Sequence, residues 1–357
     1  MRRGFFGRGS GVFHVERLFA VGLALVLLAG CAPQGEPLER TFFAMDTVMS
    51  VKLYAGGDEA LLDAAEDRVR ELEALWSVTD ENSEIYALNR DGAVSGLSPE
   101  TADLLDTALG LCQRTGGALD ISTYPLLRCW GFTTGEYSVP DEETIAALLP
   151  LADYTQVRQE GTYASLAEGM ELDLGSVAKG CTGWWLAHLL RENGVTSALL
   201  DLGGNIQTVG AKPDGSPWRV AVRDPAGDGA LGVVEVVDKA VITSGGYERY
   251  FEEDGVRYWH ILDPETGRPA HSGLVSVTVV GDTSAAWGDA GAVCDGLSTA
   301  LFVMGREEAV GFWRGHREEW GFELILVEED GSVTVTAGLE EHFTLSQTNR
   351  ALTVVHP

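Results

Sequence analysis

The spacing of hydrophobic and polar positions predicts several helices along the chain. Between Asp58 and Trp76 the apolar residues recur with helical spacing, which is typical of an amphipathic helix. Ser98, Pro99 and Gly116 are the residue types that begin and end a second helix. The remaining predicted helices are a short one from Asp141, Ser176 to Asn193 closed by Gly194, Leu297 to Met304, and Glu307 to Trp313.

Alternating, β-branched stretches predict strands between and after these helices. The predicted strands are Arg40 to Tyr54, Leu199 to Asp201, Trp218 to Arg223, Val233 to Val237, Ala240 to Thr243, Val275 to Val280, Glu323 to Val327 and Ser332 to Val335. A hairpin is expected around the turn Glu253-Asp254-Gly255, and a tight turn at Asp263 to Gly267. Because helices and strands mix without a regular βαβ repeat, the pattern predicts an α+β fold.

The first thirty residues have the pattern of an export signal. Basic residues precede the apolar run Leu18 to Leu28, which is too short to span a bilayer as a permanent helix. Small residues before Cys31 favour lipoprotein processing, with the Cys31 thiol carrying the lipid; an ordinary or uncleaved signal is the alternative. We therefore expect a signal peptide over 1–30, a tether over 31–39, and an exported chain anchored to the outer face of the cytoplasmic membrane or the periplasmic side of the envelope.

The charge balance restricts the ligands. The chain holds 54 acidic against 25 basic side chains, a formal net charge of −29. Such a surface repels nucleic acid and anionic lipid, so DNA binding is excluded. A phosphate-bearing ligand would need a local device: a metal ion, backbone N–H groups or a placed lysine.

The cysteines argue against zinc and thioredoxin-like chemistry, since none of them forms a CxxC pair. We expect Cys112, Cys129, Cys181 and Cys294 to be buried thiols. An exported location permits disulfides, and the sequence leaves their pairing open.

Polar residues suited to chemistry gather in five stretches. These are Gly116 to Ser122, Glu171 to Gly180, Asp201 to Ile206, Thr243 to Gly267 and Asp295 to Ala300. On a helix, Asp295 and Thr299 would share one face, where a carboxylate and a hydroxyl can bind Mg²⁺. The helix start at Ser176 offers N–H groups to a phosphate, and Lys179 adds charge.

Each stretch also has an ordinary structural explanation. Asp295 and Thr299 could lie on a solvated helix face, and Asp173 could cap a helix. The pair Gly203-Gly204 is typical of a turn, and a histidine beside aromatic residues, such as His260, is more often packed than catalytic. Only the joint occurrence of the stretches favours a functional site.

Taken in order, these stretches resemble the ApbE family of FAD:protein FMN transferases, which are often exported lipoproteins. The matching segments, from Met45 to about Gly305, are Met45-Asp46-Thr47, Leu75 to Ile85 with Leu88-Asn89, Gly117 to Asp120, Asp173 to Gly180, Leu202 to Asn205, Thr243 to Gly245, His260 to Gly267 and Asp295 to Thr299. The chain departs from the family pattern at Asp46 in place of Gly, Leu119 in place of Phe, and Thr79 where Tyr is common.

The resemblance implies a T-fold-like α+β protein with largely antiparallel sheets, as one compact two-lobed unit over residues 40–340, with a tail at 341–357. It implies Mg²⁺ as cofactor and FAD as substrate. The FMN half of FAD would move onto a Thr or Ser hydroxyl of an acceptor protein, releasing AMP. Such acceptors are typically flavoprotein subunits of extracytoplasmic membrane redox complexes.

The resemblance also assigns residues to roles. The metal ligands carry over to Asp295, Thr299 and the backbone carbonyl of Ser176. The FAD-binding positions carry over to Met45, Thr79, Ala118, Leu119, Asp120, Asp173, Lys179, Thr243, His260 and Ile261. Asp289 is a rival to Asp295, which we prefer because Ser298 and Thr299 follow it in the family's spacing.

Asp295 and His260 are the expected catalytic residues of a metal-assisted phosphoryl transfer. We hypothesise that His260 accepts the proton of the acceptor hydroxyl, because the reference pKa of histidine lies near neutrality; packing against FAD is the alternative role.

Two other functions stay open. One is a hydrolase that splits FAD into FMN and AMP. The other is a non-catalytic solute-binding lipoprotein, which would not need the pair Asp295 and Thr299.

Overall fold

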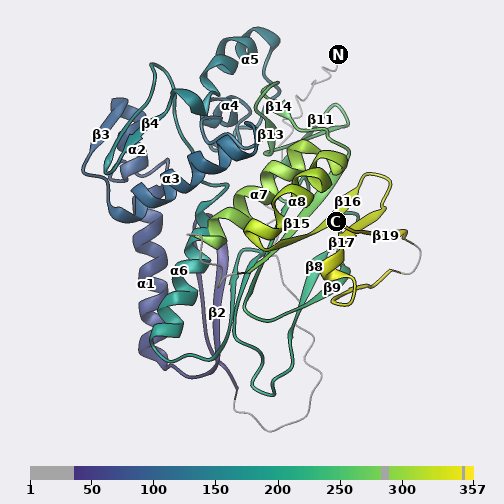
Figure 1. Cartoon of the computed structure of the whole chain (residues 1–357). Coiled ribbons are helices and arrows are strands. Elements are labelled where there is room, and N and C mark those ends of the chain that lie inside the picture. Colours follow the sequence, from purple (N-terminus) through teal and green to yellow (C-terminus); the bar gives the residue numbers. More distant parts are fainter. Residues whose placement is uncertain (1–35, 283–288, 348–349) are drawn as a thin grey trace, which may run out of the picture.

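A nine-stranded sheet forms the centre of the molecule in the computed structural model, which describes residues 36–282, 289–347 and 350–357 (Figure 1). In spatial order its strands are β1 (Leu38–Ala44), β2 (Thr47–Ala55), β6 (Ser197–Leu202), β7 (Asn205–Val209), β10 (Lys239–Gly245), β15 (Leu274–Asp282), β16 (Phe322–Glu328), β17 (Val333–Thr336) and β19 (Leu352–Val355). Neighbouring strands are antiparallel, except that β19 lies parallel to β17.

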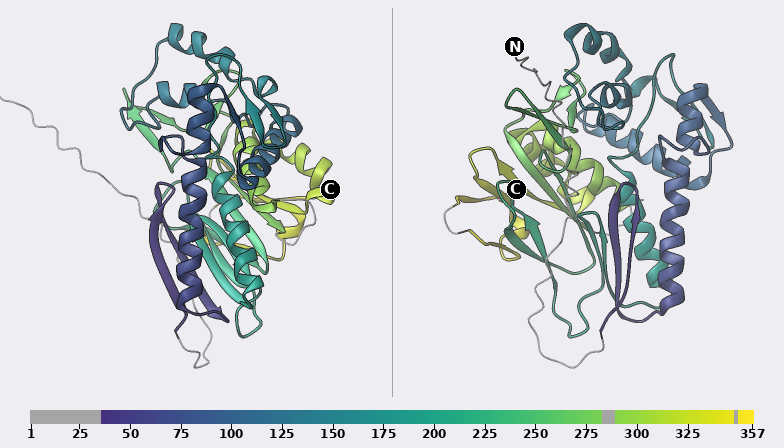
Figure 2. Two further views of the ribbon diagram at one scale, coloured as in Figure 1. Left: turned by 90° about the vertical axis from the view of Figure 1, so that its left-hand side faces the viewer. Right: turned by 180° about the vertical axis from the view of Figure 1, so that it is seen from behind.

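Helices cover one face of this sheet, and a smaller sheet packs on the other. The covering helices are α1 (Glu59–Trp76), α6 (Ala178–Glu192), α7 (Ala290–Met304) and α8 (Arg306–Trp320). Helix α1 runs along the β1–β2 hairpin in both views of Figure 2, and its Leu62 and Val69 are fully buried there with Val51 of β2. The opposite face packs on β8 (Trp218–Arg223), β9 (Ala230–Val236) and β18 (Phe343–Leu345).

A second lobe lies at the top of Figure 1. It contains α2 (Glu84–Asp91), α3 (Pro99–Arg114), α4 (Tyr124–Cys129), α5 (Glu142–Leu148) and the small sheet β3 (Ala93–Ser95), β5 (Tyr163–Ser165) and β4 (Arg158–Glu160). The hairpins β11 (Tyr250–Glu253) with β12 (Val256–Trp259) and β13 (Leu262–Asp263) with β14 (Arg268–Pro269) join it. Leu126, Trp130, Phe132, Ile145 and Leu262 form its local core.

The predicted α+β class is confirmed, and most predicted elements are present. Helices α1, α3 and α5 have Asp58, Ser98 and Asp141 as their N-caps, and each cap carboxylate or hydroxyl accepts a backbone N–H of the first turn. The hairpin turn at Asp254-Gly255 and the turn at Asp263 to Gly267 also form as predicted.

The prediction of one strand from Arg40 to Tyr54 is wrong, because the chain reverses at Met45 and Asp46. The two residues have φ values of 48° and 59°, and Ala44 pairs directly with Thr47. This is the geometry of a two-residue hairpin loop with positive φ at both positions. Gly and Asn are the residues that most often take positive φ in such a loop, and neither Met45 nor Asp46 is one of them. The local sequence therefore does not mark the turn.

The predicted helix start at Ser176 is also wrong by two residues. Helix α6 begins at Ala178, because Val177 and Ala178 both donate their backbone N–H to the carbonyl of Leu174 in a tight turn. The end of the helix agrees with the prediction, since Gly194 follows it with a φ of 79°.

Three other predictions concern the C-terminal tail, the cysteines and the signal peptide. Residues beyond Leu339 add β18 to the small sheet and β19 to the large one. Cys112, Cys129, Cys181 and Cys294 are free thiols, but Cys129 is partly exposed, so the expectation of four buried thiols is wrong there. The predicted signal peptide and the predicted lipidation site at Cys31 lie outside the described residues. Among the described residues, no helix is long and apolar enough to cross a membrane.

Candidate functional site

One cavity, of about 340 Å³, brings together the predicted site residues. Its lining comes from the β1–β2 turn, the segment after α1, the segments before α4 and α6, strand β10, the β12–β13 connection and helix α7. The predicted residues around it are Met45, Thr79, Ala118, Leu119, Asp120, Asp173, Ser176, Lys179, Thr243, His260, Ile261, Asp295 and Thr299. Segments far apart in the sequence therefore converge here, while the individual roles of these residues stay predictions.

Asp295 is held in one orientation by two donors. It lies on α7 with 5% of its surface exposed. Its Oδ2 accepts the backbone N–H of Gly180 at 2.8 Å, and its Oδ1 accepts the side-chain amide of Asn205 at 3.0 Å. Burial raises the pKa of Asp295, and the positive charge of Lys179 opposes that rise. A nearby cation would favour the charged carboxylate further.

The hydroxyls beside Asp295 form a chain with a definite proton order. Ser298 Oγ donates to the carbonyl of Asp295 at 2.7 Å. Ser298 must then accept from Ser244 Oγ, 2.7 Å away, which in turn leaves Ser244 to accept from Thr299 Oγ1 at 3.2 Å. The lone pairs of Thr299 are therefore available to a cation, and Thr299 lines the cavity one helical turn from Asp295.

The backbone carbonyl of Ser176 completes a set of oxygen donors that fits Mg²⁺. In a regular helix it would accept the N–H of Gly180, but Gly180 donates to Asp295 instead. Among the described residues no backbone N–H donates to the Ser176 carbonyl. A carboxylate, a hydroxyl and a carbonyl without a donor are hard oxygen ligands of the kind Mg²⁺ takes, with waters and ligand phosphates in its other positions.

His260 is held as a neutral ring. Burial lowers its pKa to about 3, helped by the positive charges of Arg249 and Lys179. Its Nδ1 lies 3.2 Å from the carbonyl of Arg249, which can only accept, so Nδ1 carries the proton in this tautomer. Nε2 then keeps a free lone pair, but a pKa of about 3 makes it a weak base, which differs from the near-neutral pKa on which the sequence-based hypothesis rested.

Two acidic residues shape the rest of the cavity. Asp120 is buried and accepts hydrogen bonds from the backbone and hydroxyl of Ser122 and from the backbone of Tyr154, at 2.5 to 3.0 Å. Asp173 accepts the N–H of Gly175 at 2.7 Å, and burial raises its pKa. Asp120 therefore holds the segment before α4 against the segment at Tyr154. Asp173 lies near the positive charges of Lys179 and Arg249.

Sequence reasoning missed several residues that line this cavity: Glu73, Trp76, Asn205, Glu248 and Arg249. Asn205, Glu248 and Arg249 lie inside stretches already noted as polar, so their position was a usable signal. Trp76 lies inside the matching segment Leu75 to Ile85, but it also ends the apolar face of α1 and is 4% exposed, which is typical of a core residue. Its indole N–H nevertheless has no partner among the described residues, which leaves it free to donate to a ligand.

The rival to Asp295 has a different place. Asp289 does not line this cavity. It is the N-cap of α7, and its Oδ1 accepts the backbone N–H of Ala292 at 2.8 Å. Its position is therefore that of a helix N-cap, where its carboxylate also contacts Cys181.

Fold and cavity together define an α+β protein in which hard oxygen atoms, a lysine and a histidine line one cavity. Comparison with known proteins places it more closely: the model of the ApbE family matches residues 45–322. The chain therefore belongs to the ApbE family, and the prediction from the ordered motifs is confirmed.

Relatives and solved structures agree with this placement. The chain is 33% identical over 352 residues to an FAD:protein FMN transferase of Treponema pallidum, covering 89% of this chain and 93% of that protein. It is 34% identical over 306 residues to one of Vibrio cholerae, covering 82% and 90%. The crystal structure of the ApbE protein of Thermotoga maritima matches with a TM-score of 0.78 at 30% identity, over 86% of this chain and 99% of that chain.

Proposed function

We propose that this protein transfers the FMN moiety of FAD onto a Thr or Ser hydroxyl of an acceptor protein, in a Mg²⁺-dependent reaction that releases AMP. The observation that carries the proposal is the single cavity in which the oxygen ligands around Asp295, the Lys179 ammonium and the neutral His260 ring meet. Its membership of a family whose curated relatives are named FAD:protein FMN transferases supports flavin transfer.

The chemistry is a displacement at phosphorus. The acceptor oxygen forms a bond to the FMN-side phosphorus of FAD, and the bond from that phosphorus to the bridging oxygen breaks, so AMP leaves with the electron pair. The hydroxyl proton passes to Nε2 of His260, which is neutral and has its other nitrogen fixed by the Arg249 carbonyl. Lys179 lies on the same cavity and supplies positive charge to the pyrophosphate.

Asp295, Thr299 and the Ser176 carbonyl would hold Mg²⁺ in this proposal. When bound, Mg²⁺ neutralises the charge that builds on the pyrophosphate oxygens and the departing phosphate. The protein's own part is to hold Asp295 through Gly180 and Asn205 and Thr299 through Ser244, while the bond from Gly180 to Asp295 leaves the Ser176 carbonyl without that donor.

The N-terminal sequence supports a location for this activity. A lipid on Cys31 would anchor the protein on the outer face of the cytoplasmic membrane or within the periplasmic side of the envelope. The acceptor would then be a flavoprotein subunit of an extracytoplasmic membrane redox complex, which presents its Thr or Ser on the same side.

A transfer assay tests the proposal. The chain from residue 32 onward is mixed with FAD, Mg²⁺ and an acceptor flavoprotein domain, and the denatured products are separated on a gel. We expect a fluorescent acceptor band that disappears when EDTA is present. AMP and FMN without a labelled acceptor would instead favour the hydrolase, in which water takes the place of the acceptor hydroxyl beside His260. Absence of all products would contradict both.

A further inference from the structure

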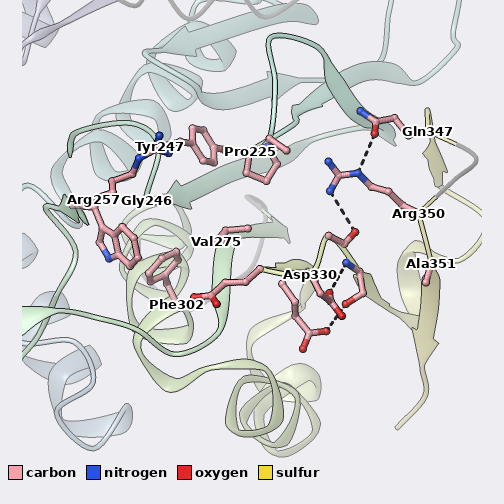
Figure 3. A pocket seen from close by; sticks show the side chains of 16 residues that line it. Pro225, Gly246, Tyr247, Arg257, Val275, Phe302, Asp330, Gln347, Arg350 and Ala351 are labelled. Carbon is pink, nitrogen blue, oxygen red and sulfur yellow. Dashed lines mark hydrogen bonds between the residues drawn. The ribbon is translucent and has the colours of Figure 1, made fainter. Parts of the chain in front are cut away.

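A second cavity, a groove of about 640 Å³ (Figure 3), adjoins the candidate active site. In the connection from β10 to β11, Gly246 and Tyr247 line this groove, whereas the following Glu248 and Arg249 line the FAD cavity. The same alternation recurs at the end of β12, where Trp259 lines the groove and His260 lines the candidate active site. Consecutive residues therefore separate the two cavities. A molecule bound in the groove would lie directly beside the candidate active site.

The two sides of the groove differ in chemistry. One side is apolar and aromatic: the half-buried Tyr247 and Val275 line it, and Trp259 and Phe302 belong to the same wall as buried side chains. The other side is the β16–β17 turn, with Glu329 and Asp330 exposed, and the exposed Ala351. An apolar wall opposite a polar rim is typical of sites that anchor one large side chain and select its neighbours by charge.

The rim has a net negative charge because its basic groups are already paired. Arg350 forms a largely buried ion pair with Asp224 at 2.6 Å, and Arg257 pairs with Glu252 at 3.0 Å. The carboxylates of Glu329 and Asp330 form no ion pair within the described parts of the chain. Hydrogen bonds from Ser332 lower the pKa of Asp330, so it is ionised at neutral pH.

We propose that this groove docks the acceptor protein, binding a segment that places an apolar or aromatic side chain on the Tyr247 wall and a lysine or arginine on the rim of Glu329 and Asp330. The inference rests on the proposed function, because it names the surface that presents the acceptor hydroxyl to the neighbouring cavity. A second copy of this chain is a poor occupant, since its formal net charge of −29 would bring like charges together.

Kinetics of flavin transfer test the groove with a charge reversal. The variant Glu329→Lys with Asp330→Lys changes the rim without touching the FAD cavity. The matched control is Asp103→Lys with Asp106→Lys, two exposed carboxylates on α3 without ion pairs among the described residues. The probe is an acceptor flavoprotein domain that the wild-type chain labels.

We expect the rim variant to raise the KM for the acceptor about tenfold and to lose its dependence on salt, with kcat and the Kd for FAD unchanged and the control equal to wild type. A second variant, Ala351→Arg, should raise the same KM by filling the groove. Unchanged acceptor KM in both variants would refute the docking site while leaving the transferase intact. A change in sedimentation mass without a change in KM would assign the groove to self-association. If the wild-type chain labels no acceptor, the proposed function is contradicted, and the docking site that rests on it is contradicted with it.

Discussion

Two donors from distant parts of the chain fix the carboxylate of Asp295: the backbone of Gly180 and the side chain of Asn205. Replacing Asp295 with Ala removes a proposed metal ligand and leaves both donors without an acceptor. We expect Asp295→Ala to abolish Mg²⁺-dependent transfer and to lower stability by about 1–3 kcal/mol while the protein still folds. Steady-state transfer rates and thermal melts measure the two effects.

Asp289→Ser is the matched control for this prediction. Serine keeps the N-cap that Asp289 provides for α7, and the residue does not line the FAD cavity, so activity should stay near that of wild type. Normal transfer by Asp295→Ala together with loss in Asp289→Ser would exchange the two assignments.

The depressed pKa of His260 has consequences for both rate and stability. Its value of about 3 in the folded protein lies below the ordinary 6.5, so between these values the unfolded chain binds a proton that the folded chain does not. Stability from this residue therefore falls as the pH drops from 6.5 towards 3. We expect His260→Asn to flatten the pH dependence of Tm over this range and to slow transfer by about 10²–10⁴-fold.

The wild-type rate should show no decline near pH 6.5 that depends on His260, because the ring stays neutral well below that pH. A pH–rate profile of wild type beside His260→Asn measures this. An Asn variant with wild-type rate and profile would restrict His260 to packing against FAD.

At the scale of elements, the contact between α6 and α7 positions Asp295, the proposed metal ligand. A Cβ on Gly180 would lie 2.1 Å from the carbonyl of Gly291 and 2.7 Å from Cβ of Asp295, so the two helices can approach this closely only because both positions are glycine. We expect Gly180→Ala to cost about 1–3 kcal/mol of stability and to reduce transfer sharply, as measured by denaturant unfolding and by rate.

Gly183→Ala, one turn further along α6, is the control. Its Cβ would meet Leu202 at 3.4 Å, an ordinary contact, and alanine raises helix propensity by up to about 1 kcal/mol. This variant should be at least as stable as wild type and fully active. Equal behaviour of the two alanine variants would show that the helix contact does not set the site.

The elements also show what the sequence can predict. Helices α1, α3 and α5 were predictable because Asp58, Ser98 and Asp141 are N-cap residues followed by a clear apolar face. The turn at Met45 and Asp46 was not, since residues with side chains hold its positive φ angles through tertiary contacts such as the hydrogen bond from Met45 N to Glu73 at 2.6 Å.

The candidate site was predictable to the extent that its residues stand in ordered motifs. Asp295, Thr299 and Lys179 carry that order in the sequence. The proton order of the hydroxyls, the Ser176 carbonyl released by Gly180, and the unpaired indole of Trp76 depend on side chains from separate elements. No local pattern contains such contacts, so they had to come from the structure.

At the scale of the whole molecule, a strongly acidic protein also has an acidic cavity, in which Asp46, Glu73, Asp120, Asp173, Glu248 and Asp295 stand against Lys179 and Arg249. The formal net charge of −29 would repel a dinucleotide, yet Lys179 and Arg249 line the cavity and a bound cation would add to them. Residues of both lobes line that cavity, and the adjoining groove is the proposed surface for a protein partner. Substrate and acceptor would therefore meet at the wall that Tyr247 and Glu248 share.

In the proposed reaction, the cavity joins FMN from FAD to an acceptor hydroxyl. The most direct measurement is the intact mass of an acceptor domain and the amount of AMP in the same reaction, with wild type and Asp295→Ala run in parallel. The account predicts an acceptor mass increased by FMN less one water, one AMP for each acceptor modified, and neither product from the variant. AMP and FMN with an unmodified acceptor, or full modification by Asp295→Ala, would contradict it.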